Sequence, residues 1–295
     1  MSDRDVVQLK SGAASATLAL LGAEPVSWRP GGRELIWEGD PRHWSDRAPI
    51  LFPVVGASSG GAVRVGGQAY PMPQHGFARR LPFTLAERSE ARARLVLADT
   101  PETRAAYPFA FRLEVEAELE EAALALTFTV ANTGEAELPF SLGFHPAFPW
   151  PFDGGDREAY AVRFEAAETA RLPDVVPGGL LAPGGRRLPL DGTRLALDPA
   201  MFTEALCVLG AESRSLRFVA PSGAAIGMAV ENFPHLALWT RPDAPFLSLE
   251  AWTGHADWAG FAGELRDRAS ITRLAPGAEA RHLVRLTWEP APAHG

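Results

Sequence analysis

Apolar and charged residues alternate along residues 111–130, and this pattern constrains the fold more than any other feature of the chain. Leu113, Val115 and Ala117 take the apolar positions, with Glu114 and Glu116 between them. A period of two places successive side chains on opposite faces of a strand, so that one face is buried and the other is solvated. The pattern predicts half-buried β structure, and it makes the acidic residues a solvated sheet face rather than a metal site.

Short apolar runs separated by turn residues recur along the whole chain. The 28 glycines and 26 prolines fall between these runs rather than in one linker, which predicts many short strands. Gly66 and Gly67 stand between two alternating flanks and predict a tight hairpin, because glycine readily adopts positive φ angles. Further strands are expected at residues 15–21, 25–28, 34–37, 206–209, 215–219, 225–230, 236–240, 246–252 and 282–288.

Only one segment has helical spacing. Trp258, Phe261 and Leu265 are three and four residues apart and predict a helix over residues 256–268. Residues 173–192 are rich in Pro and Gly and predict long surface loops. Neither an internal repeat nor a break in composition marks a domain boundary. We therefore predict one all-β domain over residues 1–295, a large antiparallel β-sandwich with few short helices.

The composition excludes several classes of protein. The hydrophobic share of 46% and the charged share of 22% are typical of a globular protein, and a net charge of -8 argues against nucleic acid or an anionic membrane as a partner. The first residues lack a basic region followed by an apolar one, and the apolar run at 16–23 is too short to span a bilayer. We expect a cytoplasmic protein.

Two residue types that often carry chemistry are almost missing. Cys207 is the only cysteine, which excludes an internal disulfide and any metal site built from cysteines. Lys10 is the only lysine, and its place near the N-terminus suits neither a P-loop nor an enzyme that needs an amine nucleophile.

Three segments combine polar side chains with aromatic, Gly and Pro residues, as loops around a pocket do. They are residues 73–79, 141–151 and 246–257. The second contains His145 among the large apolar residues Phe144, Phe148 and Trp150. Imidazole titrates near neutrality, so His145 is either a proton donor or acceptor, or a hydrogen-bonded core histidine.

Glu250 is the notable residue of the third segment. Alternation places it on one strand face with Phe246, Ser248 and Trp252. A carboxylate beside aromatic rings is costly to desolvate unless it is used or paired. Glu250 is therefore either a functional group or the partner of an arginine.

These segments resemble the signature stretches of a known family. The stretches are His-Gly-Phe-Ala-Arg at 75–79, Gly-Phe-His-Pro-Ala-Phe at 143–148, and Pro-Phe-Leu-Ser-Leu-Glu-Ala-Trp-Thr-Gly at 245–254 with Asp257. In order and spacing they resemble those of the aldose 1-epimerase (galactose mutarotase) family, in particular its LacX-like branch. The similarity runs from about residue 9 to residue 286. It implies a galactose mutarotase-like β-sandwich, no cofactor and no metal, and interconversion of the α and β anomers of a free aldose such as glucose or galactose.

The resemblance also implies roles for individual residues. His145 matches the general acid of the family, Glu250 the general base, and His75 a histidine that binds the sugar near its ring oxygen. Glu204 stands where the family has an aspartate that holds sugar hydroxyls. Many members carry an arginine after the Phe-Pro-Val-Val-Gly stretch, where this chain has Ala-Ser-Ser, and this departure leaves Arg79 as the candidate cation of the pocket.

Mutarotation requires removal of the proton on O1 and delivery of a proton to the ring oxygen, which one carboxylate and one imidazolium can perform. On ordinary pKa values, activity is expected to rise with pH as Glu250 ionises and to fall as His145 loses its proton. Trp150, Trp239, Trp252 and Trp258 are candidates for stacking on a sugar, and His255 is a candidate because it follows Glu250 closely.

Two further functions stay open at this point. A related branch that acts on hexose 6-phosphates shares the His-Gly-Phe-Ala-Arg stretch, and Arg79 and Arg80 are cations suited to a phosphate. A sugar-binding or sensing protein without turnover is the other, although retention of both His145 and Glu250 counts against it. A glycosidase fits less well, because it would use two carboxylates. A small-molecule sugar is the expected partner, with the protein a monomer or a homodimer.

Overall fold

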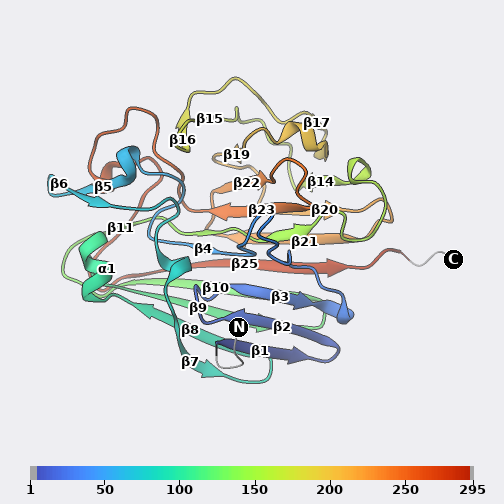
Figure 1. Ribbon diagram of the computed structural model, residues 1–295, viewed down its shortest axis with the longest axis horizontal. Helices are drawn as coiled ribbons and strands as arrows, with labels where there is room; N and C mark the ends of the chain where they lie inside the picture. The colour runs from blue at the N-terminus through green and yellow to red at the C-terminus, as the bar shows by residue number, and fades with distance from the viewer. Residues whose placement is uncertain (1–4, 293–295) are drawn as a thin grey trace.

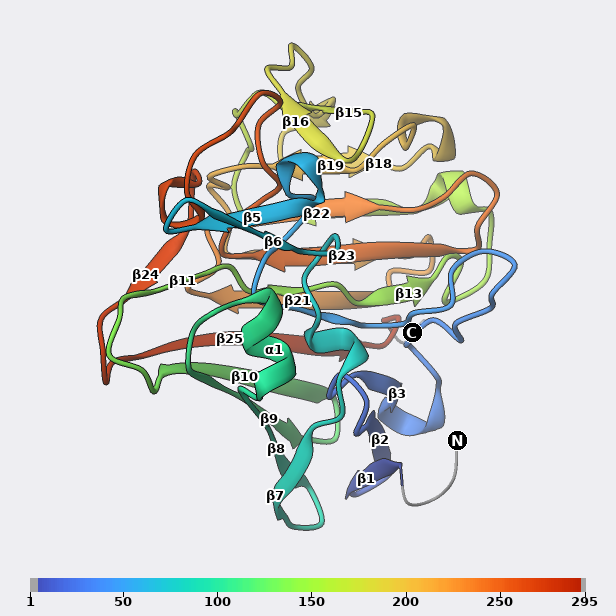
Figure 2. The ribbon, with the colours of Figure 1, turned by 60° about the vertical axis from the view of Figure 1, so that its left-hand side comes forward.

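The computed structural model describes residues 5–292, and its regular secondary structure consists mainly of antiparallel strands (Figures 1 and 2). Its largest sheet has ten strands in the order β17-β18-β14-β20-β21-β25-β10-β9-β8-β7. Their bounds are β17 Leu190–Asp191, β18 Arg194–Ala196, β14 Ala161–Phe164, β20 Ser215–Val219, β21 Ala225–Glu231, β25 Glu279–Glu289, β10 Ala123–Asn132, β9 Phe111–Leu119, β8 Arg92–Ala98 and β7 Thr84–Arg88.

A six-stranded sheet packs against the ten-stranded one. Its order is β19-β22-β23-β12-β4, and β13 also pairs with β23. The bounds are β19 Leu206–Val208, β22 His235–Trp239, β23 Phe246–Trp252, β12 Gly143–Phe144, β4 Ile50–Leu51 and β13 Ala147–Pro149. Smaller sheets are formed by β1 Val6–Ser11, β2 Ala14–Ala19 and β3 Pro25–Arg29; by β5 Ala62–Val65 and β6 Gln68–Pro71; by β11 Leu138–Phe140 and β24 Thr272–Leu274; and by β15 Asp174–Val176 and β16 Leu180–Ala182.

The helices are short. Among the described residues the one α-helix is α1 Pro101–Ala106, which the sequence did not predict and which Thr100 caps by accepting from the Thr103 amide. The 3₁₀ turns are η1 Pro30–Gly32, η2 Ser59–Gly61, η3 Ala78–Arg80, η4 Arg157–Ala159, η5 Pro199–Met201 and η6 Leu265–Asp267. No helix within residues 5–292 is long and apolar enough to cross a membrane.

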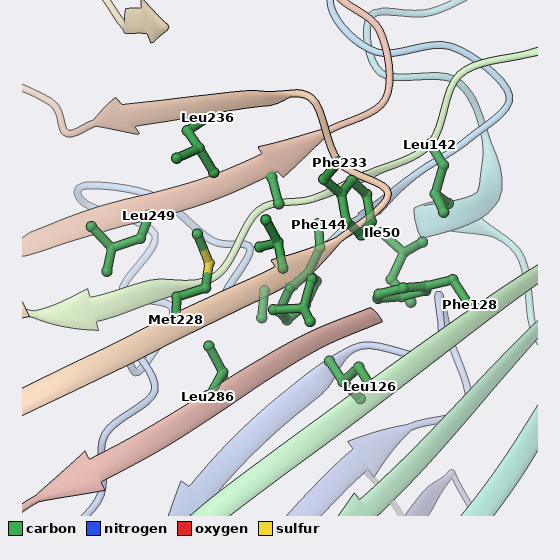
Figure 3. Packing of buried hydrophobic residues seen from close by; sticks show 14 of the residues in the cluster. Ile50, Leu126, Phe128, Leu142, Phe144, Met228, Phe233, Leu236, Leu249 and Leu286 are labelled. Carbon is green, nitrogen blue, oxygen red and sulfur yellow. The ribbon is translucent and has the colours of Figure 1, made fainter. Parts of the chain in front are cut away.

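The core lies between the two large sheets. Leu126 and Phe128 of β10 and Leu286 of β25 point toward Phe144 and Leu249 of the six-stranded sheet (Figure 3). The predicted alternation is confirmed, because the apolar positions of β9 are buried while its charged ones reach solvent. The predicted all-β sandwich is therefore confirmed as well.

Several local predictions are also confirmed. Strands β20 and β23 have the predicted bounds, and the glycines at 66 and 67 join β5 to β6 with φ angles of 60° and 80°. The Pro- and Gly-rich residues 173–192 run as loops, but they also carry the short pair β15 and β16 and the edge strand β17.

Two predicted elements are wrong. Residues 256–268 form loops and the turn η6 rather than a helix, because their backbone groups bond elsewhere: the Asp257 amide donates to the Ala57 carbonyl and the Ala259 amide to the Leu181 carbonyl. Gly260, at φ 88°, also interrupts any helix there. Residues 34–37 form no strand, since Glu34 instead accepts hydrogen bonds from the Ser27 hydroxyl and the Trp28 amide.

Candidate active site

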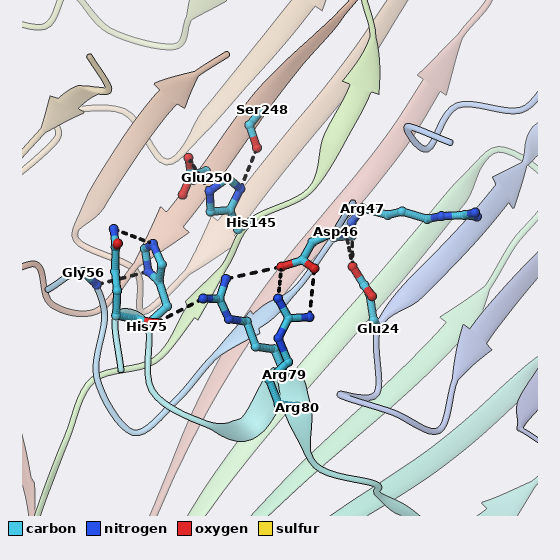
Figure 4. A network of polar contacts seen from close by, with 12 residues as sticks. Glu24, Asp46, Arg47, Gly56, His75, Arg79, Arg80, His145, Ser248 and Glu250 are labelled. Atoms are coloured by element: carbon cyan, nitrogen blue, oxygen red, sulfur yellow. Dashed lines mark hydrogen bonds and ion pairs between the residues drawn. The ribbon is translucent and has the colours of Figure 1, made fainter. Parts of the chain in front are cut away.

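The two residues expected to carry acid–base chemistry lie opposite each other on neighbouring strands. Phe144 of β12 pairs with Ala251 of β23, and Ala147 of β13 pairs with Ser248. Carried across the gap between β12 and β13, this register places His145 directly opposite Glu250. Nε2 of His145 lies 3.2 Å from Oε1 of Glu250 (Figure 4). The two side chains are 9% and 1% exposed.

Strand β23 separates the core from this site. Its buried Leu247 and Leu249 belong to the main hydrophobic core, whereas alternation turns Ser248, Glu250 and Trp252 to the opposite face of the sheet. The strand-face assignment made from the sequence thus agrees with the packing.

Both side chains of the pair have a second contact within this face. Nδ1 of His145 lies 2.8 Å from Oγ of Ser248, and the indole Nε1 of Trp252 donates to Oε2 of Glu250 at 3.0 Å. Gly143 lies opposite Trp252, and a Cβ at this glycine would come 3.1 Å from the indole Cδ1. The missing side chain therefore gives the indole room to lie beside the Glu250 carboxyl.

Aromatic rings surround the imidazole of His145, but they come from distant segments. The ring centroid of Trp44 lies 4.9 Å from that of His145, with an angle of 34° between the ring planes. The corresponding values are 5.4 Å and 86° for Trp239, and 5.9 Å and 83° for His75. The sequence neighbours that were expected to form these walls, Phe144, Phe148 and Trp150, are instead part of the main core. That expectation is wrong because alternate residues along a strand face opposite ways.

Burial acts on both members of the pair. It lowers the pKa of His145 well below its usual value, and the nearby His75 and Arg79 add to this effect. It raises the pKa of the Glu250 carboxyl well above its usual value, and the Trp252 hydrogen bond opposes this only in part. Both directions favour the uncharged groups, an arrangement in which one proton is shared between Oε1 of Glu250 and Nε2 of His145.

His75 is held as a neutral hydrogen-bond donor. Its Nδ1 accepts from the Gly56 amide at 3.1 Å, and its own amide donates to the Gly56 carbonyl at 2.9 Å. Burial lowers the pKa of His75 to about 3. The ring proton is therefore on Nε2.

The turn that carries His75 fixes its position. His75 has a φ of 67°, which is uncommon outside glycine, and Gly76 has a φ of 70°. A Cβ at Gly76 would come 2.2 Å from the Phe52 carbonyl oxygen. Only glycine fits this close approach, so the turn places the imidazole in a single location.

Arg79 supplies donors that the protein does not saturate. Its side chain is 20% exposed, its Nη1 lies 3.3 Å from Asp46, and its Nη2 donates to the Gln74 carbonyl. Nε of Arg79 is buried and has no partner within the described residues. Arg80 donates two shorter hydrogen bonds to Asp46, at 2.9 and 3.0 Å, whereas Arg79 makes one longer contact with it (Figure 4). Arg79 is therefore less strongly bound to Asp46 than Arg80 is.

Glu204 already has protein partners on both oxygens. Oε2 accepts from the Val175 amide at 2.8 Å, and Oε1 pairs with Arg186. The carboxylate therefore anchors the start of β15, and any contact with a sugar would use its remaining lone pairs.

The five residues with an expected catalytic or sugar-binding role line one cleft of about 790 Å³ at the outer face of the six-stranded sheet. They are His75, Arg79, His145, Glu204 and Glu250. No cluster of three or more metal-binding side chains occurs among residues 5–292.

The match to known proteins agrees with this geometry. The family described as aldose 1-epimerase matches residues 5–265. The plasmid-encoded protein LacX of Lactococcus lactis subsp. lactis is 30% identical over 283 residues, covering 92% of this chain and 95% of LacX. This chain belongs to the aldose 1-epimerase family.

Solved structures share the fold along almost the whole chain. A galactose mutarotase-like protein from Lactobacillus casei has a TM-score of 0.89 at 27% identity, with 96% of this chain and all of that protein covered. A galactose mutarotase related enzyme from Lactobacillus acidophilus has a TM-score of 0.90 at 24% identity, with 98% of this chain and 99% of that protein covered. The epimerase family fold is thus the galactose mutarotase-like sandwich that the sequence predicted.

Further residues line the cleft of this epimerase family member. Of the four candidate tryptophans, Trp239 and Trp252 line it, while Trp150 and Trp258 are not among the lining residues. Reasoning from sequence missed Trp44, Asp46, Gln74 and Arg241, which also line the cleft. Trp44 lies outside the recognised motifs, so no sequence pattern predicted it here. For Ser248, the alternation of β23 already predicted that it shares a strand face with Glu250.

Neither His255 nor His235 is among the residues that line the cleft. His255 is buried with Nδ1 against the Ala256 carbonyl, and His235 begins β22. His294 lies outside the described residues.

Proposed function

We propose that the chain is a cofactor-independent, cytoplasmic aldose 1-epimerase that interconverts the α and β anomers of a free aldose. One observation carries this proposal: a carboxyl and an imidazole lie 3.2 Å apart at the base of an open cleft. The pair can supply one proton donor and one proton acceptor, and ring opening requires one of each.

The chemistry follows from the two side chains. Glu250 in its ionised form takes the proton from O1 while His145, protonated on Nε2, delivers a proton to the ring oxygen. The C1–ring oxygen bond breaks, O1 becomes the aldehyde oxygen, and rotation about C1–C2 exposes either face of the carbonyl. Ring closure reverses both transfers, so the enzyme ends with the protonation it began with. Each transfer supplies roughly 10²- to 10⁴-fold.

A bound sugar would change the state of the pair. Burial favours the neutral form of both groups, and hydroxyl groups of the sugar would replace some of the solvation that burial removes. The charged arrangement, with imidazolium and carboxylate, has the same number of protons as the neutral one. Turnover therefore requires no proton from solvent.

The other cleft residues suit binding. His75 presents Nε2–H and Arg79 presents the remaining N–H groups of Nη1 and Nη2, which fit sugar oxygens, while Trp44 and Trp239 offer aromatic faces. Such contacts hold the ground state and the transition state alike.

A hexose 6-phosphate is the second candidate substrate. Arg79, Arg80 and Arg241 all line the cleft, and cations of this kind bind phosphate. Asp46 neutralises part of this charge, because both Arg79 and Arg80 contact it. The free sugar is therefore the first choice.

Polarimetry distinguishes the candidates. Freshly dissolved α-glucose and α-galactose should reach their equilibrium rotation faster with the protein than without it. Glucose 6-phosphate, followed by anomer-resolved NMR, tests the second candidate. Acceleration of the phosphate alone would replace the first proposal by the second, and acceleration of neither would support a binding protein.

Replacing Arg79 with alanine is expected to raise KM by about tenfold while kcat falls less, because uniform binding is lost. The measurement is the initial rate of mutarotation over a range of sugar concentrations. Arg163→Ala, on an exposed position of β14, is the matched control and should leave both constants unchanged. Unchanged constants in Arg79→Ala would make this arginine structural.

A further inference from the structure

The hydroxyl of Ser248 lies between two groups, and only one arrangement of its proton satisfies both contacts. Oγ is 2.8 Å from Nδ1 of His145 and 2.8 Å from the carbonyl oxygen of Pro146. A carbonyl oxygen can only accept, so the serine must donate its single proton to Pro146. If the serine donated to His145 instead, two oxygen atoms would face each other at 2.8 Å without a proton between them.

The imidazole must therefore donate to the serine. Oγ retains a lone pair that faces Nδ1, which requires a proton on Nδ1 of His145. Neutral imidazole carries one proton, so Nε2 is then bare and faces Glu250 at 3.2 Å. Because the serine is fully buried, no competing partner from solvent reaches it.

We infer that Ser248 is a positioning residue that holds the proton of neutral His145 on Nδ1, so that Nε2 alone exchanges a proton with the sugar. The kinetic consequence rests on the proposed epimerase function, but the location of the proton does not. The hydroxyl serves both states of the cycle, since imidazolium and the neutral ring each present Nδ1–H to it.

Loss of the hydroxyl has a defined effect on the pair. Imidazolium would leave Nδ1–H buried without an acceptor, whereas a neutral ring protonated on Nε2 would donate to the Glu250 carboxylate. The titratable and charged groups facing His145 are Glu250 from β23, His75 from the turn before η3 and Arg79 from η3, and none of them contacts Nδ1 in place of Ser248. The pair would then lose its catalytic proton at lower pH.

Threonine and valine at position 248 separate the hydroxyl from the shape of the side chain. Ser248→Thr keeps the oxygen and should retain kcat within about threefold of the parent and the same pH profile. Ser248→Val replaces that oxygen by a methyl group; kcat should fall about ten- to a hundredfold with little change in KM, and the alkaline limb should move to lower pH. Ser213→Ala removes another fully buried serine away from the cleft and should leave the pH profile unchanged.

The proton is also observable without turnover. In protein labelled with ¹⁵N in its histidines, the His145 signals are assigned by their loss in His145→Asn. Nδ1 of His145 should show the shift of a protonated nitrogen near neutral pH. A bare Nδ1 in the parent protein, or equal pH profiles for the threonine and valine variants, would overturn the inference. Absence of mutarotation in the parent would overturn the proposed function and leave the NMR result to decide the role of Ser248.

Discussion

Replacing Glu250 with glutamine is expected to lower kcat by about 10³-fold while sugar still binds. The amide keeps the shape of the side chain and its contact with Trp252, but it cannot take a proton from O1. Polarimetry measures the loss of turnover. Tryptophan fluorescence measures binding, because Trp44, Trp239 and Trp252 line the cleft.

The control is a glutamate on a solvated strand face. Glu118→Gln changes an exposed residue of β9 and should leave kcat and KM as they are. Activity of Glu250→Gln within tenfold of the parent would exclude Glu250 as the base. Loss of sugar binding together with turnover would show that the carboxylate holds the substrate rather than deprotonates it.

The same substitution bears on why a carboxyl is buried here at all. The sequence left open whether Glu250 is the partner of an arginine, and within residues 5–292 its contacts are His145 and the Trp252 indole, with no arginine ion pair. A buried carboxyl without a cation is costly. Glu250→Gln should therefore leave the melting temperature unchanged or raise it, which is the behaviour of a residue retained for function.

Local patterns in the sequence were sufficient to predict an all-β sandwich and to assign the residues of β23 to its two faces. Alternation reports which face of a strand is buried, and it correctly grouped Ser248, Glu250 and Trp252. The helix expected at residues 256–268 failed because its spacing also suits a loop whose amides bond to other segments. Spacing in one segment does not reveal such long-range hydrogen bonds.

The position of the candidate site was predictable to a similar extent. The motif resemblance identified residues that the structure brings into one cleft, from segments as distant as His75 and Glu250. It could not identify Trp44, which packs against His145 from a loop without a motif. Nor could it show that Ser248 reaches His145, because that contact depends on the register between β13 and β23.

The pH dependence of kcat/KM is expected to be bell-shaped, with limbs that belong to the pair rather than to either residue. The active pair holds one proton between its acid and its base. Burial lowers the pKa of His145 and raises that of Glu250, so neither limb is expected at the ordinary pKa of its residue.

Burial also reverses the assignment made from ordinary pKa values. Both shifts favour loss of the imidazolium proton before loss of the carboxyl proton as pH rises. The acid limb is then the loss of the second proton from the pair, and the alkaline limb is the loss of its last proton.

Replacing His145 with asparagine tests this assignment. Asparagine keeps a hydrogen-bond donor but has no transferable proton, so kcat should fall by about 10³-fold. Only Glu250 then titrates, and because the base must be ionised, residual activity should rise with pH through its raised pKa and show no alkaline fall. Initial rates of mutarotation across the pH range measure this. An unchanged alkaline limb in His145→Asn would show that another residue is the acid. His75, which is held neutral with a pKa of about 3, is tested by the same measurement in His75→Asn. If that variant keeps both limbs, His75 is excluded as the acid.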